Sequence, residues 1–173
     1  MTPAETFILV SYFFVLSILA VYGWHRYYLV YLYMRTKDLK PEPPPPLGPP
    51  PRVTVQLPIF NEMYVADRLI DAVCCMDYPR DLLEIQVLDD STDETQQIAE
   101  LAVRRHAAQG IDIKYFHRGD RWGYKAGALE AGLKAARGKF IAIFDADFLP
   151  GADFLRRLLP HFSDDREIGR AHV

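Results

Sequence analysis

The sequence has little cysteine and no large charge imbalance, and both features narrow the class of protein. Its 173 residues include two cysteines, Cys74 and Cys75, which are adjacent and therefore poorly placed to bridge each other. It contains no CxxC pair and no Cys/His cluster, so we expect neither a zinc site nor a disulfide scaffold, as is typical of a reducing compartment. The formal net charge of -3 excludes the strongly basic surface of a protein that binds nucleic acid.

Charged residues are also missing from residues 6–24, TFILVSYFFVLSILAVYGW. A helix of this length crosses a hydrocarbon core at 1.5 Å per residue, so we predict a transmembrane helix with an interfacial extension over residues 5–34. A signal peptide would need a basic leader and a small-residue cleavage site, whereas this leader is MTPAE. The tyrosine-rich residues 27–34 either continue the helix or lie along the membrane surface.

Basic residues flank the apolar segment on its C-terminal side. Arg26, Arg35 and Lys37 follow it, whereas Glu5 precedes it. Because positive charge stays on the cytoplasmic side, we expect the N-terminus outside and the rest of the chain in the cytosol, at a plasma or inner membrane. Residues 35–52 include PEPPPPLGPPP and are predicted to form a semi-rigid linker, because proline lacks an amide donor and fixes φ.

After the linker, short apolar runs alternate with segments of helical periodicity. The predicted strands are residues 53–57, 85–88, 111–116 and 140–144. The predicted helices lie near residues 65–76, 91–109, 129–136 and 152–159. Ser91 and Glu94 have the spacing of a capping box, and FIAIF, which is apolar throughout, is expected at the centre of the sheet. The alternation predicts an α/β fold with a mainly parallel sheet.

Polar clusters follow three of the predicted strands, at the edge where open parallel sheets bind ligands. They are Pro58 to Glu62, then Asp89 and Asp90, then Asp145 and Asp147. Carboxylates gathered at one edge repel each other unless a cation joins them. Oxygen ligands suit Mg²⁺ or Mn²⁺, which bind through one or two carboxylates and substrate phosphates. Helix capping is the competing interpretation for both acidic pairs.

The segment HRGDRWGYKAG, residues 117–127, is basic, glycine-rich and leads into a predicted helix. A helix N-terminus beside lysine and arginine attracts phosphate, although the P-loop pattern is absent. We expect Lys125 to contact a ligand. For Arg118 and Arg121, ligand contact and a solvated loop are equally compatible with the sequence.

The runs LPIFNE, MDYPRDLLEIQVLDDSTDET, GYKAGAL and FDADF, in this order, resemble family 2 glycosyltransferases with a Rossmann-like GT-A fold. The resemblance covers Val53 to about Ser163 and is strongest to the membrane-bound β-glycan synthases of the cellulose synthase-like and glucomannan synthase-like branch. It implies an inverting, metal-dependent hexosyltransferase that takes sugar from UDP- or GDP-hexose to extend a β-linked polysaccharide. A glycosyl-diacylglycerol or polyprenyl-phosphate acceptor, and a non-catalytic nucleotide-sugar-binding module, remain alternatives.

The resemblance also implies roles for particular residues. Asp90, with help from Asp89, would contact the nucleoside, and Lys125 would lie near the nucleotide. The pocket for base and ribose would be lined by Pro58, Asn61 and Glu62. The metal, Mg²⁺ or Mn²⁺, would be held by Asp145 and Asp147, with Asp147 the more direct ligand.

Two motifs of the family are not found in this sequence: the T-E-D or E-D aspartate that acts as general base, and the acceptor-binding Q-x-x-R-W. We therefore expect a truncated GT-A domain over residues 53–167 that binds donor, has no catalytic base and does not transfer sugar by itself. Residues 168–173, IGRAHV, do not continue the family pattern and are expected to be an artefactual tail, with a divergent genuine tail as the alternative.

Overall fold

The computed structural model describes residues 2–39 and 48–162. The chain divides into two compact units, Met1–Pro43 and Pro44–Val173. The central part of the predicted proline-rich linker and the predicted tail at residues 168–173 lie outside the described residues. The boundaries predicted for the linker and the tail therefore stay predictions.

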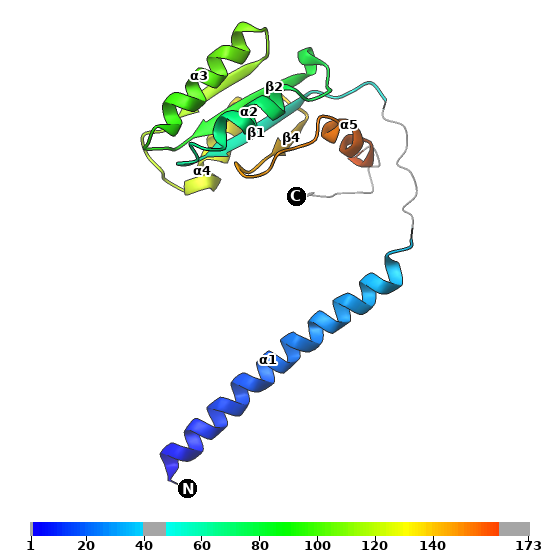
Figure 1. The fold of residues 1–173 in the computed structure, drawn as a ribbon, viewed down its shortest axis with the longest axis vertical. Helices are drawn as coiled ribbons and strands as arrows, with labels where there is room; N and C mark the ends of the chain where they lie inside the picture. Colours follow the sequence, from blue (N-terminus) through cyan, green and yellow to red (C-terminus); the bar gives the residue numbers. More distant parts are fainter. Residues whose placement is uncertain (1, 40–47, 163–173) are drawn as a thin grey trace. The chain divides into compact units, whose positions relative to one another are not determined.

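The first unit contains one long helix, α1, over Pro3–Thr36 (Figure 1). Its N-terminus is closed by a capping box, in which the Glu5 amide donates to Thr2 Oγ1 and the Thr2 amide donates to the Glu5 carboxylate. At 1.5 Å per residue the helix is about 50 Å long, more than a hydrocarbon core of about 30 Å requires. Residues 27–34 continue the helix, which is the first of the two alternatives predicted for that segment.

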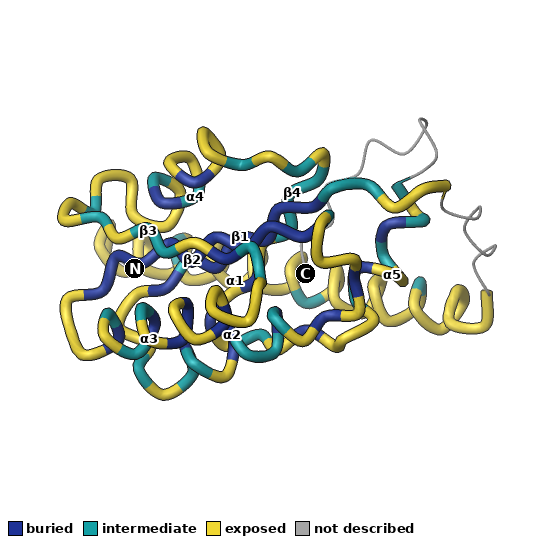
Figure 2. Tube along the Cα trace, turned by 90° about the horizontal axis from the view of Figure 1, so that it is seen from above, coloured by how far each residue is buried: buried dark blue, intermediate teal, exposed yellow. Residues whose placement is uncertain are grey.

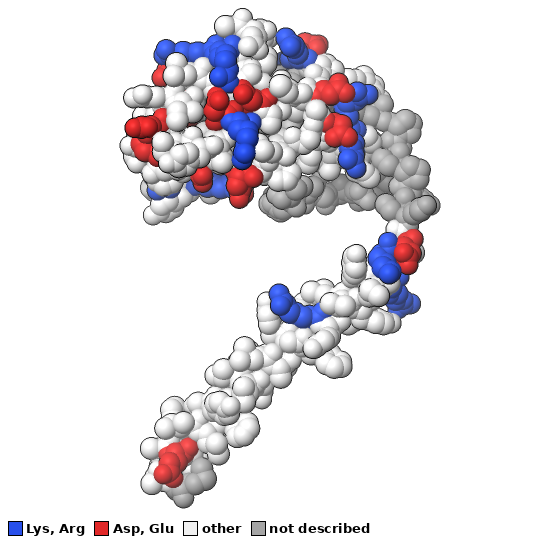
Figure 3. All heavy atoms as spheres, viewed as in Figure 1, with Lys and Arg blue, Asp and Glu red and all other residues white. Residues whose placement is uncertain are grey.

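Within the described residues, α1 is the one helix long and apolar enough to cross a membrane, with a mean hydropathy of 2.1 over its most apolar window. Figure 3 shows the uneven charge along it, with one acidic patch near its N-terminus and basic side chains toward its other end. The acidic residue is Glu5, and the basic ones include Arg26 and Arg35. The predicted transmembrane helix is thus present as a helix of sufficient length and apolar character.

The second unit is built on a four-stranded parallel sheet with the strand order β3-β2-β1-β4. The strands are β1 Val53–Ile59, β2 Leu83–Asp89, β3 Ile113–His117 and β4 Phe140–Ile143. In the register of the central pair, Val53 lies beside Leu83 and Ile59 beside Asp89, so β1 and β2 end together at one edge. The predicted α/β fold with a parallel sheet is confirmed.

Helices cover both faces of this sheet, as Figure 2 shows by the buried band between them. On one face lie α2, Ala66–Cys74, and α3, Thr95–Ala108, and on the other lies α4, Tyr124–Ala135. Short helical segments complete the unit: α5 Phe154–Leu158 and two 3₁₀ turns, η1 Arg80–Leu82 and η2 Leu159–Phe162. Because side chains alternate along a strand, β1 and β2 present one row of residues to each layer.

The two rows differ in polarity. The row facing α2 and α3 is aliphatic and fully buried, for example Val55, Leu57 and Ile85. The row facing α4 is polar and buried, with Gln56 Nε2 donating to Gln86 Oε1 at 3.0 Å. Helix α4 approaches this row through Gly132, where an added Cβ would lie 2.7 Å from Gln56 Nε2.

Glu84 extends the polar row to the amino ends of the strands. Its buried carboxylate accepts hydrogen bonds from Thr54 Oγ1 at 2.8 Å, from the Arg137 amide at 2.8 Å and Nε at 3.0 Å, and from Lys114 Nζ at 3.3 Å. Burial opposes ionisation, but these donors outweigh it and hold the pKa of Glu84 at about 2. The network ties the segment after α4 to the sheet.

Two local predictions were wrong. Among the described residues β4 lies at an edge of the sheet, beside β1. The aromatic side chains of this run pack against the helical segments that follow it. The Phe140 ring lies 5.8 Å from the Phe162 ring, and the Phe144 ring, directly after β4, lies 5.1 Å from the Phe154 ring. The Ser91 capping box does not form either, because α3 begins at Thr95 and the Ser91 hydroxyl accepts from the Asn61 amide at 2.8 Å.

Candidate functional site

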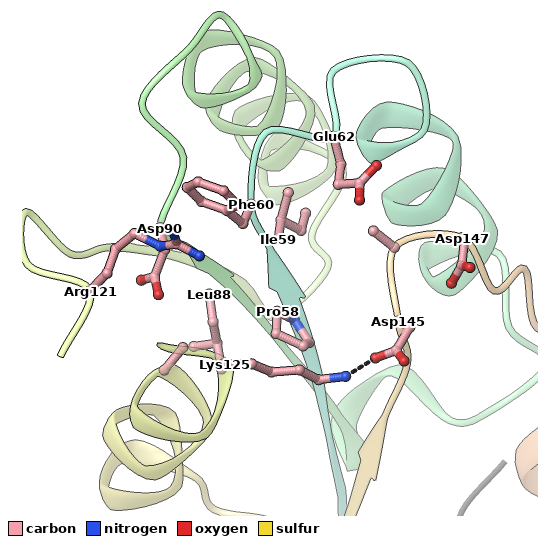
Figure 4. Close-up of a pocket in the computed structure, with 12 residues that line it drawn as sticks. Pro58, Ile59, Phe60, Glu62, Leu88, Asp90, Arg121, Lys125, Asp145 and Asp147 are labelled. Atoms are coloured by element: carbon pink, nitrogen blue, oxygen red, sulfur yellow. Dashed lines mark hydrogen bonds and ion pairs between the residues drawn. The ribbon is translucent and has the colours of Figure 1, made fainter. Parts of the chain in front are cut away.

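A pocket of about 330 Å³ opens where β1, β2 and β4 end and α4 begins (Figure 4). We call it the sheet-edge pocket. Six residues predicted from the sequence as nucleotide or metal ligands line it: Pro58, Glu62, Asp90, Lys125, Asp145 and Asp147. They come from three strand ends and one helix start, so the parallel topology brings them together as expected.

The sheet-edge pocket has two chemically different ends. Figure 4 shows Phe60, Asp90 and Arg121 at one end and the acidic residues Asp145 and Asp147 toward the other. Between them the Lys125 side chain extends from the start of α4 and pairs with Asp145. The Lys125 and Asp145 side chains are each about half exposed, at 53% and 54%, so a ligand can reach both.

Asp90, by contrast, is nearly buried at 5% exposure, and both of its carboxylate oxygens accept a hydrogen bond. Arg118 donates from Nε to Asp90 Oδ1 at 2.8 Å and from Nη2 to Asp90 Oδ2 at 2.5 Å. This is the two-pronged arrangement for which a planar guanidinium is suited. The sequence left the role of Arg118 open, and the structure makes it the partner of Asp90.

The same guanidinium also holds the loop between β3 and α4. Arg118 Nη1 donates to the Trp122 carbonyl at 3.2 Å, and Nη2 donates to the Tyr124 carbonyl at 3.1 Å. The loop turns through left-handed backbone at Gly123, φ +74°, and Tyr124, φ +50°. A Cβ on Gly127 would lie 2.1 Å from the Trp122 carbonyl oxygen, so glycine permits this close fold. We call this arrangement the Arg118 clasp.

The Arg118 clasp presents Arg121 to the sheet-edge pocket. The guanidinium carbon of Arg121 lies 3.3 Å from the centre of the Phe60 ring and 5.3 Å from that of Tyr124. Its Nε is buried and has no hydrogen-bond partner within the described residues. Sequence reasoning missed this arrangement, because the residues meet only when the loop after β1 and the loop after β3 come together.

Two predicted site residues lie outside the wall of the sheet-edge pocket. Asp89 is fully buried; its Oδ1 accepts from the Ser91 amide at 2.9 Å and its Oδ2 accepts from Tyr115 Oη at 2.6 Å. Burial and this bond to a carboxylate raise the pKa of the Tyr115 hydroxyl. Asn61, in left-handed backbone at φ +52°, accepts from the Thr92 amide at 2.9 Å. Asp89 and Asn61 therefore join loops rather than face the cavity.

The acidic end of the sheet-edge pocket holds the two carboxylates predicted to bind a metal, Asp145 and Asp147. In the part of the chain that the structure describes, no group of three or more His, Cys, Asp or Glu side chains converges. Asp145 and Asp147 nevertheless both line the sheet-edge pocket with exposed side chains. Two carboxylates suit Mg²⁺ or Mn²⁺ when phosphate and water supply the remaining oxygens. The residues thus fit a hard cation that arrives with a phosphate ligand.

The sequence is similar to plant polysaccharide synthases. Residues 54–170 match Glycosyl transferase family 2. Glucomannan 4-beta-mannosyltransferase 2 from Arabidopsis thaliana is 52% identical over 114 residues, which are 64% of this chain and 21% of that protein. Glucomannan 4-beta-mannosyltransferase 1 from Oryza sativa subsp. japonica is 43% identical over 137 residues, which are 76% and 26%. The chain thus spans about a fifth to a quarter of the length of these relatives.

Two solved structures share the fold. A mannosyltransferase from Pyrobaculum calidifontis in complex with GDP-Man and Mn²⁺ matches with a TM-score of 0.68 and 34% identity, over 85% of this chain and 43% of that one. TarS from S. aureus in complex with UDP matches with a TM-score of 0.54 and 26% identity, over 61% and 30%. The predicted GT-A fold is confirmed, and from the match over residues 54–170 the chain belongs to glycosyl transferase family 2.

Proposed function

We propose that this chain binds the nucleotide-sugar donor, GDP-mannose, for a glycosyltransferase that builds a β-linked mannose-containing polysaccharide. The observation that carries the proposal is the convergence of Pro58, Glu62, Asp90, Lys125, Asp145 and Asp147 on one pocket at the carboxyl edge of the sheet. The two plant relatives are named for glucomannan synthesis. Their names favour a glycan acceptor over a lipid acceptor.

The choice of GDP over UDP rests on the neighbours. The mannosyltransferase solved with GDP-Man has a TM-score of 0.68, whereas TarS with UDP has 0.54. The same mannosyltransferase also contains Mn²⁺. We propose that Asp145 and Asp147 hold a divalent cation here, with Mn²⁺ rather than Mg²⁺ as the preferred ion. Such an ion supplies positive charge that stabilises the leaving diphosphate.

Lys125 has a defined part in this proposal. Its ammonium already neutralises Asp145 across the sheet-edge pocket, and a diphosphate entering between them offers it a second anionic partner. The Arg118 clasp fixes the first turn of α4 on which Lys125 is carried. Positive charge is therefore positioned for the diphosphate before the donor arrives, which lowers the ordering cost of binding.

We also propose that α1 anchors the domain to a membrane with the N-terminus outside and the GT-A domain in the cytosol. The asymmetry between Glu5 on one side and Arg26, Arg35 and Lys37 on the other supports this orientation. A cytosolic domain has access to nucleotide sugars made there.

The donor proposal is tested with the full chain in detergent micelles. Isothermal titration calorimetry should detect binding of GDP-mannose with Mn²⁺, loss of that binding with EDTA, and weaker binding of UDP-glucose. Mannose 1-phosphate, which lacks the nucleoside, is the matched control ligand and should bind weakly. A chain that is folded by circular dichroism but binds no nucleotide sugar with either metal would contradict the proposed function.

A further inference from the structure

We propose that Arg121 binds the nucleobase of the donor and selects guanine over uracil. The proposal deepens the donor-binding function proposed above and rests on it. Neither the motifs of the sequence nor the metal pair assigns a role to Arg121. Its position in the sheet-edge pocket, its packing and its unused hydrogen-bonding capacity carry the argument.

The direction of the donor in the sheet-edge pocket follows from charge. The diphosphate and its cation belong at the end that holds Lys125, Asp145 and Asp147. The nucleoside must then extend toward the opposite end, where Figure 4 shows Phe60, Asp90 and Arg121. A base at that end meets an aromatic ring and polar groups, as is usual for small-molecule sites.

Of the polar groups at that end, Asp90 is already committed. Both of its oxygens accept from Arg118 at 2.8 and 2.5 Å, and the carboxylate is nearly buried. The remaining donors of Arg118 are directed to the Trp122 and Tyr124 carbonyls. An ionised carboxylate offers acceptors only, so Asp90 cannot pair with the O6 and N7 acceptors of guanine. Its ion pair with Arg118 instead holds the loop that carries Arg121.

Arg121 is the group with donors to spare. Its Nε is buried without a hydrogen-bond partner among the described residues, although its side chain lines the sheet-edge pocket. The distance of 3.3 Å between its guanidinium carbon and the Phe60 ring centre is that of direct stacking. Stacking on Phe60 fixes the plane of the guanidinium, so its N–H groups point sideways, toward a base lying in the same plane.

This geometry distinguishes the two bases. Guanine offers two neighbouring acceptors, O6 and N7, on one edge, and arginine pairs with both at once. Uracil offers only O4 beside a C–H group on the corresponding edge, so one of the two hydrogen bonds is lost. A good two-pronged pair discriminates between bases by roughly 5- to 150-fold in affinity. The clasped loop keeps Arg121 in place before binding, which favours the full effect.

The test compares Arg121→Gln and Arg121→Lys with the wild-type full chain in detergent micelles. Calorimetric dissociation constants for GDP and UDP are measured with Mn²⁺ present. We expect Arg121→Gln to weaken the binding of GDP by roughly 5- to 150-fold and the binding of UDP by much less. The ratio of the two dissociation constants should then approach one. Arg121→Lys keeps the charge but loses the planar fork, so it should lose selectivity too. Arg104→Gln, on the exposed face of α3 and paired to Glu100, is the matched control.

Each other outcome counts against the inference. Equal weakening of GDP and UDP by Arg121→Gln, restored by Arg121→Lys, would make Arg121 a diphosphate ligand and overturn base selection. Unchanged GDP affinity in both variants would show that Arg121 does not contact the donor. A folded wild-type chain that binds neither GDP nor UDP would overturn the proposed donor function itself and this inference with it. Wild-type GDP binding with retained selectivity in the variants would overturn only the role of Arg121.

Discussion

Arg118 and Asp90 form an ion pair through two hydrogen bonds, from Nε to Oδ1 at 2.8 Å and from Nη2 to Oδ2 at 2.5 Å. The pair joins the end of β2 to the loop between β3 and α4, because the same guanidinium also holds two carbonyls of that loop. The side chains are 18% and 5% exposed, so water screens the pair only weakly. The contact thereby fixes the backbone on either side of Arg121 and just before Lys125.

Asp90→Asn should therefore loosen the loop and destabilise the domain. The change removes the charge that compensates the Arg118 guanidinium, and breaking a buried pair in this way costs about 3 kcal/mol. We expect a lower midpoint in urea unfolding and faster amide hydrogen exchange over residues 118–127. Glu100→Gln removes an exposed partner of Arg104 and should change stability by less than about 0.5 kcal/mol. Equal effects of the two substitutions would count against the Arg118 clasp.

Gly127→Ala should disturb the same loop by crowding. An alanine Cβ would lie 2.1 Å from the Trp122 carbonyl oxygen and 2.9 Å from Arg118 Nη1, so the loop must shift and release Arg118. We expect a loss of stability of about 1–3 kcal/mol and weaker GDP binding by calorimetry. Gly119→Ala lies in the same loop with nothing within 4 Å of the added Cβ. It should leave both quantities unchanged, and a loss there equal to that of Gly127→Ala would contradict the steric explanation.

The sequence predicted the parts of the fold that depend on local pattern and on the geometry of parallel sheets. The strand ends carrying Pro58, Asp90 and Asp145 meet in one pocket because parallel strands end at a common edge. The Arg118 clasp was not predictable in this way. It depends on a contact between residues 28 positions apart and on left-handed backbone at Gly123 and Tyr124, which basic loop composition does not encode.

Apolar character was a poor guide to the position of β4 in the sheet. The apolar run FIAIF suggested a central strand, but within the described residues β4 lies at an edge, where Phe140 packs against Phe162 and Phe144 packs against Phe154. The polar residues Glu84 and Gln86, whose burial was not predicted from the sequence, are fully buried in a central strand. The Glu84 carboxylate and the Gln86 amide oxygen each accept a hydrogen bond from β1, whereas Gln86 Nε2 has no partner within the described residues. This pairing is visible only when the register is known.

Stability should depend on pH through Glu84. Its pKa is about 2 in the folded chain against an ordinary value of 4.5, so the unfolded chain takes up a proton first as the pH falls. The contribution of about 3 kcal/mol is complete above pH 4.5 and is lost progressively toward pH 2. Urea unfolding of wild type and Glu84→Gln should differ at pH 7 and converge toward pH 2. Glu130→Gln changes an exposed residue of α4, and its free energy of unfolding should follow that of the wild type at every pH. A difference between Glu84→Gln and wild type that is the same at every pH would contradict the assignment.

Asp145→Asn and Asp147→Asn should each weaken binding of Mn²⁺ in the presence of GDP. Each removes a negative charge from the acidic end of the sheet-edge pocket, and the loss should exceed the roughly 10–100-fold typical of removing a mere supporting residue. Electron paramagnetic resonance of free Mn²⁺ measures this without any transfer reaction. Asp81→Asn, in the exposed η1 turn, is the control. Wild-type Mn²⁺ affinity in both pocket variants would exclude Asp145 and Asp147 as metal ligands.

The orientation of α1 can be tested with the chain's own cysteines. Cys75 is exposed on the GT-A domain, whereas burial and the nearby Asp71 carboxylate raise the pKa of the Cys74 thiol to about 12. Only a thiolate reacts readily with maleimide, so labelling near pH 7 reports Cys75. With the domain in the cytosol, a membrane-impermeant maleimide should label Cys75 only after intact cells are lysed.

A second probe reports the other side of the membrane. Thr2→Cys, combined with Cys74→Ala and Cys75→Ala, should be labelled in intact cells, because Thr2 precedes the apolar part of α1. Reversing the charge bias with Thr2→Lys, Arg26→Glu, Arg35→Glu and Lys37→Glu should expose Cys75 in a fraction of the chains, since retained positive charge sets the orientation. Labelling of Cys75 in intact cells by the wild-type chain would overturn the cytosolic placement, and with it the access of the sheet-edge pocket to cytosolic GDP-mannose.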